Sequence, residues 1–377
     1  MDDIADTLRL LRESIRRYVE KEVAPKAAAW EAQGFVPREV LREMGRLGFL
    51  GLRYAEEYGG GALDARATAL LAEELGRSTY GGFAITVLVH TDMASPHLAN
   101  AGSPAQIRKY LPGIVSGERI AAVAVTEPDA GSDVKSIRTS ARRDGADWVL
   151  NGSKMFITNG ALADLYFVAA RTESGAGSKG ISMFIVEKGT PGFAVGRRLD
   201  KMGWRSSDTA ELVFDGCRVP AQNLLGEEGR GFYAIMRNFQ NERIAIAAMA
   251  TGEAAKAIEL TLAYVKTRKA FGAPLWDKQA IRQRLSMLAA KVEAGRQLVQ
   301  HAAALDAAGR DCVKEVSMAK AYCAELLNDV VYDCLQFHGG AGYIRETAIE
   351  RMYRDARVQS IGGGATEVML EEVAKRL

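Results

Sequence analysis

The sequence predicts an α+β multidomain fold: an N-terminal helical domain over residues 1–120, a central antiparallel β-domain over 121–227 and a C-terminal four-helix bundle over 228–377. Two observations predict this order. Apolar residues recur at helical spacing in both ends of the chain, and the middle consists of short β-rich runs bounded by turn residues. A chain of 377 residues, 48% of them hydrophobic, is long enough to form two or three domains with substantial cores.

The N-terminal part carries three segments with helical apolar periodicity, which are DTLRLLRESIRRYVEKEV, PREVLREMGRLGFLGL and ARATALLAEELGRS. The stretch EEYGGG interrupts them and is expected to form a loop. The first helix is amphipathic and charged. It lacks the apolar core and the cleavage site of a signal peptide.

The middle of the chain has a different texture. Its β-rich runs are ADWVLNGSKMFITNG, LYFVAART, SMFIVEKG, GFAVGRRL and AELVFDGCRVP. Gly, Asp, Asn and Pro bound these runs, which favours a small antiparallel barrel or sandwich.

Long helices return in the last part, in AIELTLAYVKTRKAF, KQAIRQRLSMLAAKVEAGRQLVQHAAALDAAG and KEVSMAKAYCAELLNDVVYDCLQF. Their lengths and periodicity are typical of bundle helices.

Composition argues against several classes of function. The net charge is +2, from 49 basic and 47 acidic residues, and gives no reason to expect a nucleic-acid or anionic-membrane partner. No apolar run reaches membrane-spanning length. The four cysteines, Cys217, Cys312, Cys323 and Cys334, form no CxxC pair, and the four histidines are not paired at metal-ligand spacing. We therefore expect a reduced, cytoplasmic protein without a metal site.

One glutamate is conspicuous by its position. Ile235, Phe239, Ile246 and Met249 form an apolar stripe at helical spacing, and Glu242 lies on the same face. A carboxylate on such a face must be paired, neutralised or used, because a bare buried charge is costly. A simple ion pair with Arg243 is the structural alternative.

Two short motifs offer groups that suit a planar, hydrogen-bonding ligand. AVTEPDAGSD provides the hydroxyls of Thr126 and Ser132 in a turn of small residues that a ring or a phosphate could approach closely. GSKMFITNG places Phe156 and Thr158 on one face of a strand, an aromatic ring beside a hydroxyl. Alone, each motif is equally compatible with an ordinary turn or a packed strand.

Two further motifs occur in the helical C-terminal part. TRKAFG combines Arg268 with Phe271, and Gln279 follows. Arginine suits bidentate phosphate contacts, although basic residues and a glycine also occur at ordinary helix ends. QFHGGAGYIRETAIERMYRD interrupts a long helix with glycines that allow close approach of a backbone or a cofactor.

Together these motifs resemble the FAD-dependent acyl-CoA dehydrogenase family. AVTEPDAGSDVKS and QFHGGAGYIRETAIERMYRD resemble its two signature stretches, and KMFITNG, KMGWRSSDTAELVFDGCRVP and TRKAFG resemble its other landmarks in the same order. The resemblance covers about residues 5–377. It implies the acyl-CoA dehydrogenase fold, FAD as cofactor, an acyl-CoA substrate, a homotetramer, and an electron-transfer flavoprotein as electron acceptor.

The resemblance also implies site residues. Those implied for FAD are Val125, Thr126, Ser132, Phe156, Thr158, Arg268, Phe271, Gln279, Gln336, Gly340, Ala365 and Glu367. Of these, Arg268, Phe271 and Gln279 would reach the FAD of a neighbouring subunit. Those implied for the acyl-CoA are Ser132, Ser207, Tyr233, Gln240, Arg243, Gly363 and Gly364.

The catalytic base departs from the commonest family pattern. Many members carry a glutamate before a Gly-Thr pair near the C-terminus, where this chain reads SIGGGATEVM and has Gly363, with Ala365 in place of the threonine. A subset resembling isovaleryl-CoA and long-chain acyl-CoA dehydrogenases carries its base in a Glu-Arg pair of a bundle helix, and NERIAIA fits that pattern. Glu242 is then the predicted base, and the Gly363 amide still donates to the thioester carbonyl.

The predicted reaction is α,β-dehydrogenation of an acyl-CoA to the trans-2-enoyl-CoA. Glu242 removes the α-proton and a hydride passes to flavin N5. Two alternatives remain: a flavin oxidase or monooxygenase of the same fold, and an FAD- or acyl-CoA-binding protein without a base. The acyl chain is not encoded in any recognisable pattern, and a short branched or medium chain is the preferred expectation.

Overall fold

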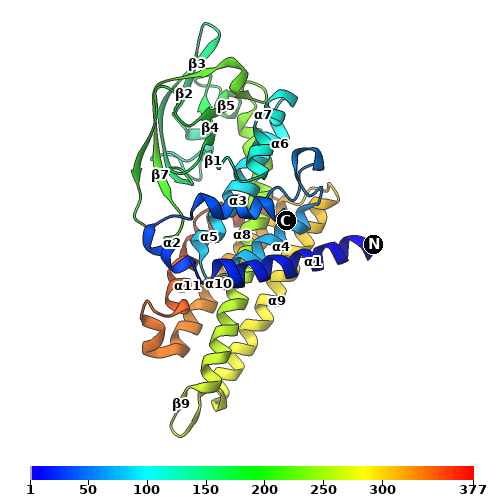
Figure 1. Ribbon diagram of the computed structural model, residues 1–377, viewed down its shortest axis with the longest axis vertical. Helices are drawn as coiled ribbons and strands as arrows, with labels where there is room; N and C mark the ends of the chain where they lie inside the picture. Colours follow the sequence, from blue (N-terminus) through cyan, green and yellow to red (C-terminus); the bar gives the residue numbers. More distant parts are fainter. Residues whose placement is uncertain (1) are drawn as a thin grey trace.

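The computed structural model describes residues 2–377 and has helices at both ends of the chain with a sheet between them (Figure 1). The N-terminal helices are α1 (Asp2–Tyr18), α2 (Ala27–Gln33), α3 (Arg38–Arg46), α4 (Ala65–Gly76), α5 (Gly81–Leu88), the π-helix η3 (Val89–Ala94), α6 (Ser95–Ala101) and α7 (Pro104–Val115). The C-terminal helices are α8 (Gly231–Thr267), α9 (Gln279–Ala307), α10 (Val313–His338), α11 (Ala348–Ala356) and α12 (Thr366–Ala374). The helix–sheet–helix order predicted from the sequence is confirmed.

The sheet occupies one end of the molecule (Figure 1). Its strands are β1 (Ala121–Ala124), β2 (Ser140–Asp144), β3 (Asp147–Thr158), β4 (Leu165–Arg171), β5 (Ile181–Glu187), β6 (Phe193–Arg198), β7 (Thr209–Pro220) and β8 (Leu224–Leu225). They follow the order β6-β7-β3-β2-β4-β5-β8, and β1 pairs with β4.

The pairing of β1 corrects the expectation of a purely antiparallel domain. β1 runs parallel to β4, with Ala121 opposite Leu165, and β2 meets β4 in parallel at Ser140 and Arg171. Parallel neighbours need a long connection between them, and β2 and β3 lie between β1 and β4 in the chain. β1 also follows directly from the helical region rather than from a hairpin.

Helix α8 runs through the centre of the helical region, where α4 and α10 pack on it. Every residue from Asn241 to Ala254 is buried. A helix that is enclosed on all sides must carry mostly small and apolar residues, as the segment IAIAAMA does. Glu242 stands at the start of this enclosed segment.

Within residues 2–377, no helix combines the length and the apolar character that a membrane crossing needs.

Candidate functional site

Glu242 is a buried carboxylate with one oxygen held and the other free. Its side chain lies on the buried face of α8, and the residue is 7% exposed. Asn238, one turn earlier, donates from Nδ2 to Oε1 of Glu242 at 3.0 Å. The described residues donate no hydrogen bond to Oε2. Burial raises the pKa of Glu242 to about 7, against the opposing effects of the Asn238 hydrogen bond and the Arg243 charge.

Two asparagines of α8 bind the carbonyls of the π-helix η3. Asn238 Nδ2 donates to the Met93 carbonyl at 2.7 Å and lies 3.3 Å from His97 Nε2. Asn241 donates in the same way to the Asp92 carbonyl. A π-helix is a rare local geometry that occurs frequently at functional sites. Here it brings polar backbone groups to the same turn of α8 that carries Glu242.

A glycine loop packs against the next turn of α8. Gly363 has φ +63°, and a Cβ added there would lie 2.2 Å from Cδ1 of Ile246. Ile246 follows Glu242 by one helical turn, so the loop and the carboxylate lie at neighbouring positions on α8. Gly364, with φ +98°, accepts a hydrogen bond at its carbonyl from Lys320 Nζ of α10. The positive φ values explain why glycine occupies both positions.

One buried cation binds this loop, and a second lies close enough to it to affect its charge. Lys320 is fully buried and Arg243 is 8% exposed. Burial lowers the pKa of Lys320 to about 8, and the Arg243 guanidinium lowers it as well. Burial also lowers the pKa of Arg243 below its usual range, although Glu372 and Glu242 oppose the shift. The positive charge favours a group that becomes negative next to the loop.

A buried ion pair fixes the AVTEPDAGSD loop onto strand β3. Lys154 Nζ lies 2.7 Å from a carboxylate oxygen of Glu127 and donates to the Val125 carbonyl at 3.0 Å. The backbone amide of Met155 donates to the Thr126 carbonyl at 2.9 Å. The loop is therefore held at a defined position beside the end of β3, and Lys154 and Glu127 are residues that the sequence analysis missed.

Phe156 projects outward at a break in β3. The register between β3 and β7 shifts between Lys154 and Ile157, and Phe156 has φ +59° and is 65% exposed. A bulge re-aims a side chain, so the regular alternation that predicted a shared face for Phe156 and Thr158 is interrupted there. A bulky residue in the left-handed region is strained, and such strain gathers at binding sites.

Within residues 2–377, the side-chain hydroxyls of Thr126, Ser132 and Thr158 form no hydrogen bond. Ser132 is exposed, and the other two residues are half-buried. Exposed aromatic surface and unpaired hydroxyls are what a flat heteroaromatic ligand requires.

Five of the predicted FAD residues on the bundle lie toward the end of the molecule away from the sheet. Phe271 is 95% exposed in the hairpin of β9 (Lys269–Ala270) and β10 (Ala273–Pro274), at the tip farthest from the sheet (Figure 1). The 26 residues of helix from Glu242 to its C-cap Arg268 correspond to about 39 Å. Tyr264 stacks on His338 at 4.3 Å, which places the end of α10 beside the last turns of α8.

These distal residues are all exposed: Arg268, Phe271, Gln279, Gln336 and Gly340. Because they lie far along the bundle from the β-domain, a single copy of the chain does not bring these residues together with Phe156 and Thr158.

The other predicted residues have mixed surroundings. Tyr233 is 42% exposed, with the Arg230 guanidinium 4.9 Å from its ring centre, and Gln240 accepts a weak hydrogen bond from Cys312 at 3.5 Å. Ser207 is buried in the loop before β7. Ala365 is the N-cap residue of α12, and Glu367 is exposed in its first turn.

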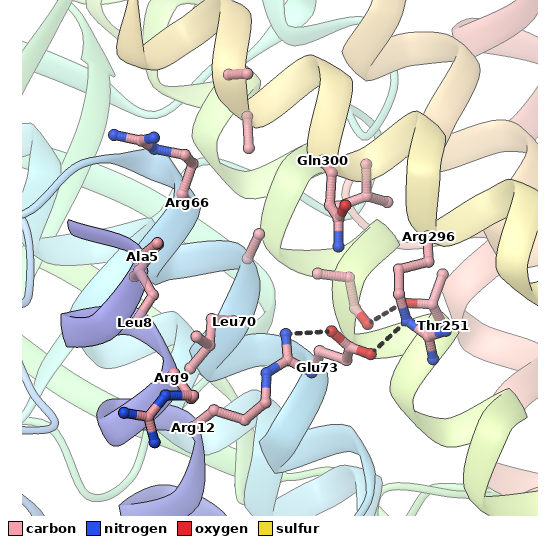
Figure 2. A pocket seen from close by; sticks show the side chains of 15 residues that line it. Ala5, Leu8, Arg9, Arg12, Arg66, Leu70, Glu73, Thr251, Arg296 and Gln300 are labelled. Atoms are coloured by element: carbon pink, nitrogen blue, oxygen red, sulfur yellow. Dashed lines mark hydrogen bonds and ion pairs between the residues drawn. The ribbon is translucent and has the colours of Figure 1, made fainter. Parts of the chain in front are cut away.

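A cavity of about 520 Å³ lies elsewhere, between α1, α4, α8 and α9 (Figure 2). Four arginines line it, and each has a carboxylate partner: Arg9, Arg12, Arg66 and Arg296. The contacts of Arg12 and Arg296 with Glu73 cross this space in Figure 2. With its cations already paired, the cavity is an ion-paired helix junction rather than an anion site.

The four cysteines are free and buried. Among the described residues, no three His, Cys, Asp or Glu side chains form a group that could hold a metal ion.

Three family models match the chain in sequence order. They are the N-terminal domain of acyl-CoA dehydrogenase over residues 5–118, its middle domain over 122–217 and its C-terminal domain over 229–377.

Individual proteins are similar over almost the whole chain. A long-chain specific acyl-CoA dehydrogenase of mouse mitochondria is 43% identical over 370 residues, which is 98% of this chain and 86% of the relative. A mitochondrial isovaleryl-CoA dehydrogenase of rice is 37% identical, covering 99% of this chain and 91% of the relative. The crystal structure of a glutaryl-CoA dehydrogenase from Mycobacterium smegmatis in complex with FADH2 superposes with a TM-score of 0.93 at 31% identity, covering 98% of this chain and 94% of that chain.

Proposed function

The chain belongs to the acyl-CoA dehydrogenase family, and we propose that Glu242 of α8 is the base that removes the α-proton of its acyl-CoA substrate. The enzyme is an oxidoreductase that carries out FAD-dependent dehydrogenation of an acyl-CoA thioester. The identity of the base, the residues that hold the ligands and the assembly are the proposed parts.

The observation that carries the proposal is the environment of Glu242. The carboxylate is buried and has one oxygen, Oε2, that no described residue engages. Burial raises the pKa of Glu242 to about 7, near the pH at which a general base works well. The loop of Gly363, where many members of the family carry their glutamate, packs one turn away along the same helix.

The chain's residues fit an FAD on the β-domain side. The exposed ring of Phe156 and the unpaired hydroxyls of Thr126, Ser132 and Thr158 offer stacking and hydrogen bonds, and Val125 belongs to the loop that the Lys154 ion pair fixes. When bound, FAD supplies the acceptor for the hydride that leaves the β-carbon.

The protein's part in the reaction is proton removal and charge stabilisation. Glu242 takes the α-proton on Oε2 while negative charge develops on the thioester oxygen. The Gly363 amide donates to that oxygen, and the charges of Arg243 and Lys320 favour it. Closure of the site by the acyl chain removes water, which makes the carboxylate more basic.

The distal residues support a proposed assembly. Phe271 is almost fully exposed, and Arg268, Gln279, Gln336 and Gly340 are exposed as well. We propose that they complete the FAD site of a neighbouring copy in a homotetramer. An electron-transfer flavoprotein is the proposed acceptor, and a cytoplasmic location remains a prediction supported by the free cysteines.

Substrate-side roles are proposed for Tyr233, Gln240 and Gly364, which lie along α8 or in the glycine loop, and for Ser132 in the AVTEPDAGSD loop. The buried Ser207 would contact substrate only if its loop moved. Ala365 and Glu367, at the start of α12, are proposed to face FAD.

The length and branching of the acyl chain differ among the relatives. The relatives named above include a long-chain and an isovaleryl-CoA enzyme, so straight and branched chains are both candidates. An added Cβ at Gly362 would find only ordinary contacts, the nearest at 3.5 Å, so space beside the loop is available there.

Steady-state dehydrogenation of a panel of straight and branched acyl-CoAs, with an artificial electron acceptor, tests the proposal. Wild type, Glu242→Gln and Glu253→Gln are compared. Glu253 is a matched control: it is a buried glutamate of the same helix, about 16 Å further along, held by Gln359 Nε2 at 2.7 Å.

Loss of turnover in Glu242→Gln but not in Glu253→Gln supports the base, and the best substrate identifies the acyl class. Equal turnover in Glu242→Gln and wild type contradicts the proposal. Rapid reoxidation of the reduced, product-bound enzyme by oxygen would favour the oxidase or monooxygenase alternative, and failure of every acyl-CoA with wild type would favour the binding protein.

A further inference from the structure

We propose that Asn238 is a positioning residue of the reaction: its amide holds Oε1 of Glu242 and the π-helix carbonyl of Met93 together, which leaves Oε2 free to take the proton. The inference rests on the proposed role of Glu242 as base. Asn238 has no proposed contact with the substrate, and it acts only through the Glu242 carboxylate.

The geometry places one nitrogen between several acceptors. Asn238 Nδ2 lies 2.7 Å from the Met93 oxygen, 3.0 Å from Glu242 Oε1 and 3.3 Å from His97 Nε2. An amide nitrogen has two hydrogens, so the two shorter contacts account for both. The residue is only 3% exposed, and water does not compete for these bonds.

The surroundings also fix which end of the amide faces Glu242. A reversed amide would place Oδ1 against the Met93 carbonyl and the Glu242 carboxylate, which are both acceptors. Burial lowers the pKa of His97 to about 4, so this ring is neutral at physiological pH and adds no charge. The Nδ2 atom is therefore directed at Glu242 by the backbone of a separate element, η3.

This arrangement ties the base to two elements at once. A free glutamate side chain samples several rotamers, and a loosely held base loses its alignment with the reacting carbon. Asn238 precedes Glu242 by four residues on the helix, so the two side chains lie one above the other. Met93 then anchors the pair across the interface between η3 and α8.

Removing the Asn238 amide should change the pH dependence of kcat, which the loss of a purely structural contact would not do. The bond favours the ionised form of Glu242, so its loss moves the titration of the base to higher pH. The acid limb of kcat should shift upward by about one pH unit, because bonds to charged groups are the stronger class of hydrogen bond. KM should stay nearly unchanged, because Asn238 offers no surface to the substrate.

Other titratable or charged side chains lie near this part of α8, and the comparison must leave them in place. They are Arg243 on α8 itself, Asp92 on η3, His97 on α6 and Lys320 on α10. Burial raises the pKa of Asp92 to about 6 and lowers that of Lys320 to about 8. Each of these side chains is retained in the variants below, so they do not account for a difference between them.

The chain offers a matched control in Asn241. Its amide also donates to an η3 carbonyl, that of Asp92, and its Oδ1 accepts from Arg53, but none of its described hydrogen bonds joins it to the Glu242 carboxylate. Asn241→Ala therefore removes a comparable anchor of the π-helix and leaves the carboxylate alone.

The experiment measures kcat and KM of the FAD-loaded enzyme from pH 6 to 9 for wild type, Asn238→Ala, Asn241→Ala and Glu242→Gln. The inference predicts an upward shift of about one pH unit and about fivefold lower kcat at pH 7 in Asn238→Ala but not in Asn241→Ala, because a pKa near 7 leaves about half of Glu242 ionised at pH 7 in the wild type. Asn238→Leu is measured beside it, because leucine has a similar size but no amide to donate, and it should shift the limb in the same direction.

An unshifted limb in both Asn238 variants, or the same shift in Asn241→Ala, would overturn the inference. If Asn238→Ala does not fold, Asn238→Leu decides alone. Glu242→Gln distinguishes failure of the proposed base from failure of the proposed positioning role. If it retains activity, the base itself is misassigned, whereas an inactive Glu242→Gln beside an unshifted Asn238→Ala refutes only the positioning role.

Discussion

Replacing Glu242 by Gln is expected to change how the stability of the protein depends on pH. The substitution keeps the size of the side chain and an oxygen that can accept the Asn238 hydrogen bond. It removes only the ionisable group. The difference in unfolding free energy between variant and wild type therefore isolates the carboxyl.

The sign follows from the direction of the shift. Burial raises the pKa of Glu242 from its ordinary 4.5 to about 7, so the folded chain binds more protons than the unfolded chain between these values. Stability that is fully present below pH 4.5 is lost as the pH rises to 7. The loss amounts to about 3 kcal/mol, at about 1.4 kcal/mol for each pH unit.

Urea unfolding at fixed protein concentration from pH 4.5 to 8 measures this difference. Relative to wild type, Glu242→Gln should gain about 3 kcal/mol between the two ends of the range. The exposed Glu56→Gln variant provides the baseline. A stability difference that is the same at every pH would refute the claim that burial controls the titration of Glu242.

Three further predictions concern the framework of the site. Lys154→Met should lower stability by about 3–5 kcal/mol in urea unfolding, because it leaves Glu127 as an unpaired buried charge, and it should lower FAD occupancy. Gly363→Ala should reduce kcat, measured in the steady state, because φ +63° and the contact with Ile246 force the loop to move. Phe271→Ala should leave the unfolding curve unchanged but weaken FAD retention about tenfold, assayed by dialysis, because the exposed ring is proposed to complete the FAD site of a neighbouring copy.

Local patterns predicted much of this structure. The apolar stripe around Glu242 predicted a buried carboxylate, and Ile235 and Met249 are fully buried as the stripe requires. The order of helices, sheet and helices followed from the spacing of apolar residues, because the buried face of each helix or strand shows in the pattern of its own sequence. The roles of the FAD and substrate residues stay predictions.

Other features depend on contacts between distant parts of the chain. Lys320 binds the Gly364 carbonyl 44 residues away, and Asn238 binds Met93 145 residues away. A buried lysine in a helix carries no mark that identifies its acceptor. The contact between Asn238 and Glu242 could have been predicted from the sequence. Asn238 precedes Glu242 by four residues, and a polar side chain on a buried helix face needs a hydrogen-bond partner.

The most direct test of the account is the single-turnover reduction of the FAD-loaded enzyme without oxygen. Wild type, Glu242→Gln and Glu253→Gln are mixed with the best acyl-CoA of the panel, and the visible absorbance of the flavin is followed. The account predicts bleaching in wild type and Glu253→Gln and a rate lower by at least about a thousandfold in Glu242→Gln. Bleaching of Glu242→Gln at the wild-type rate would contradict the claim that this buried carboxylate is the base.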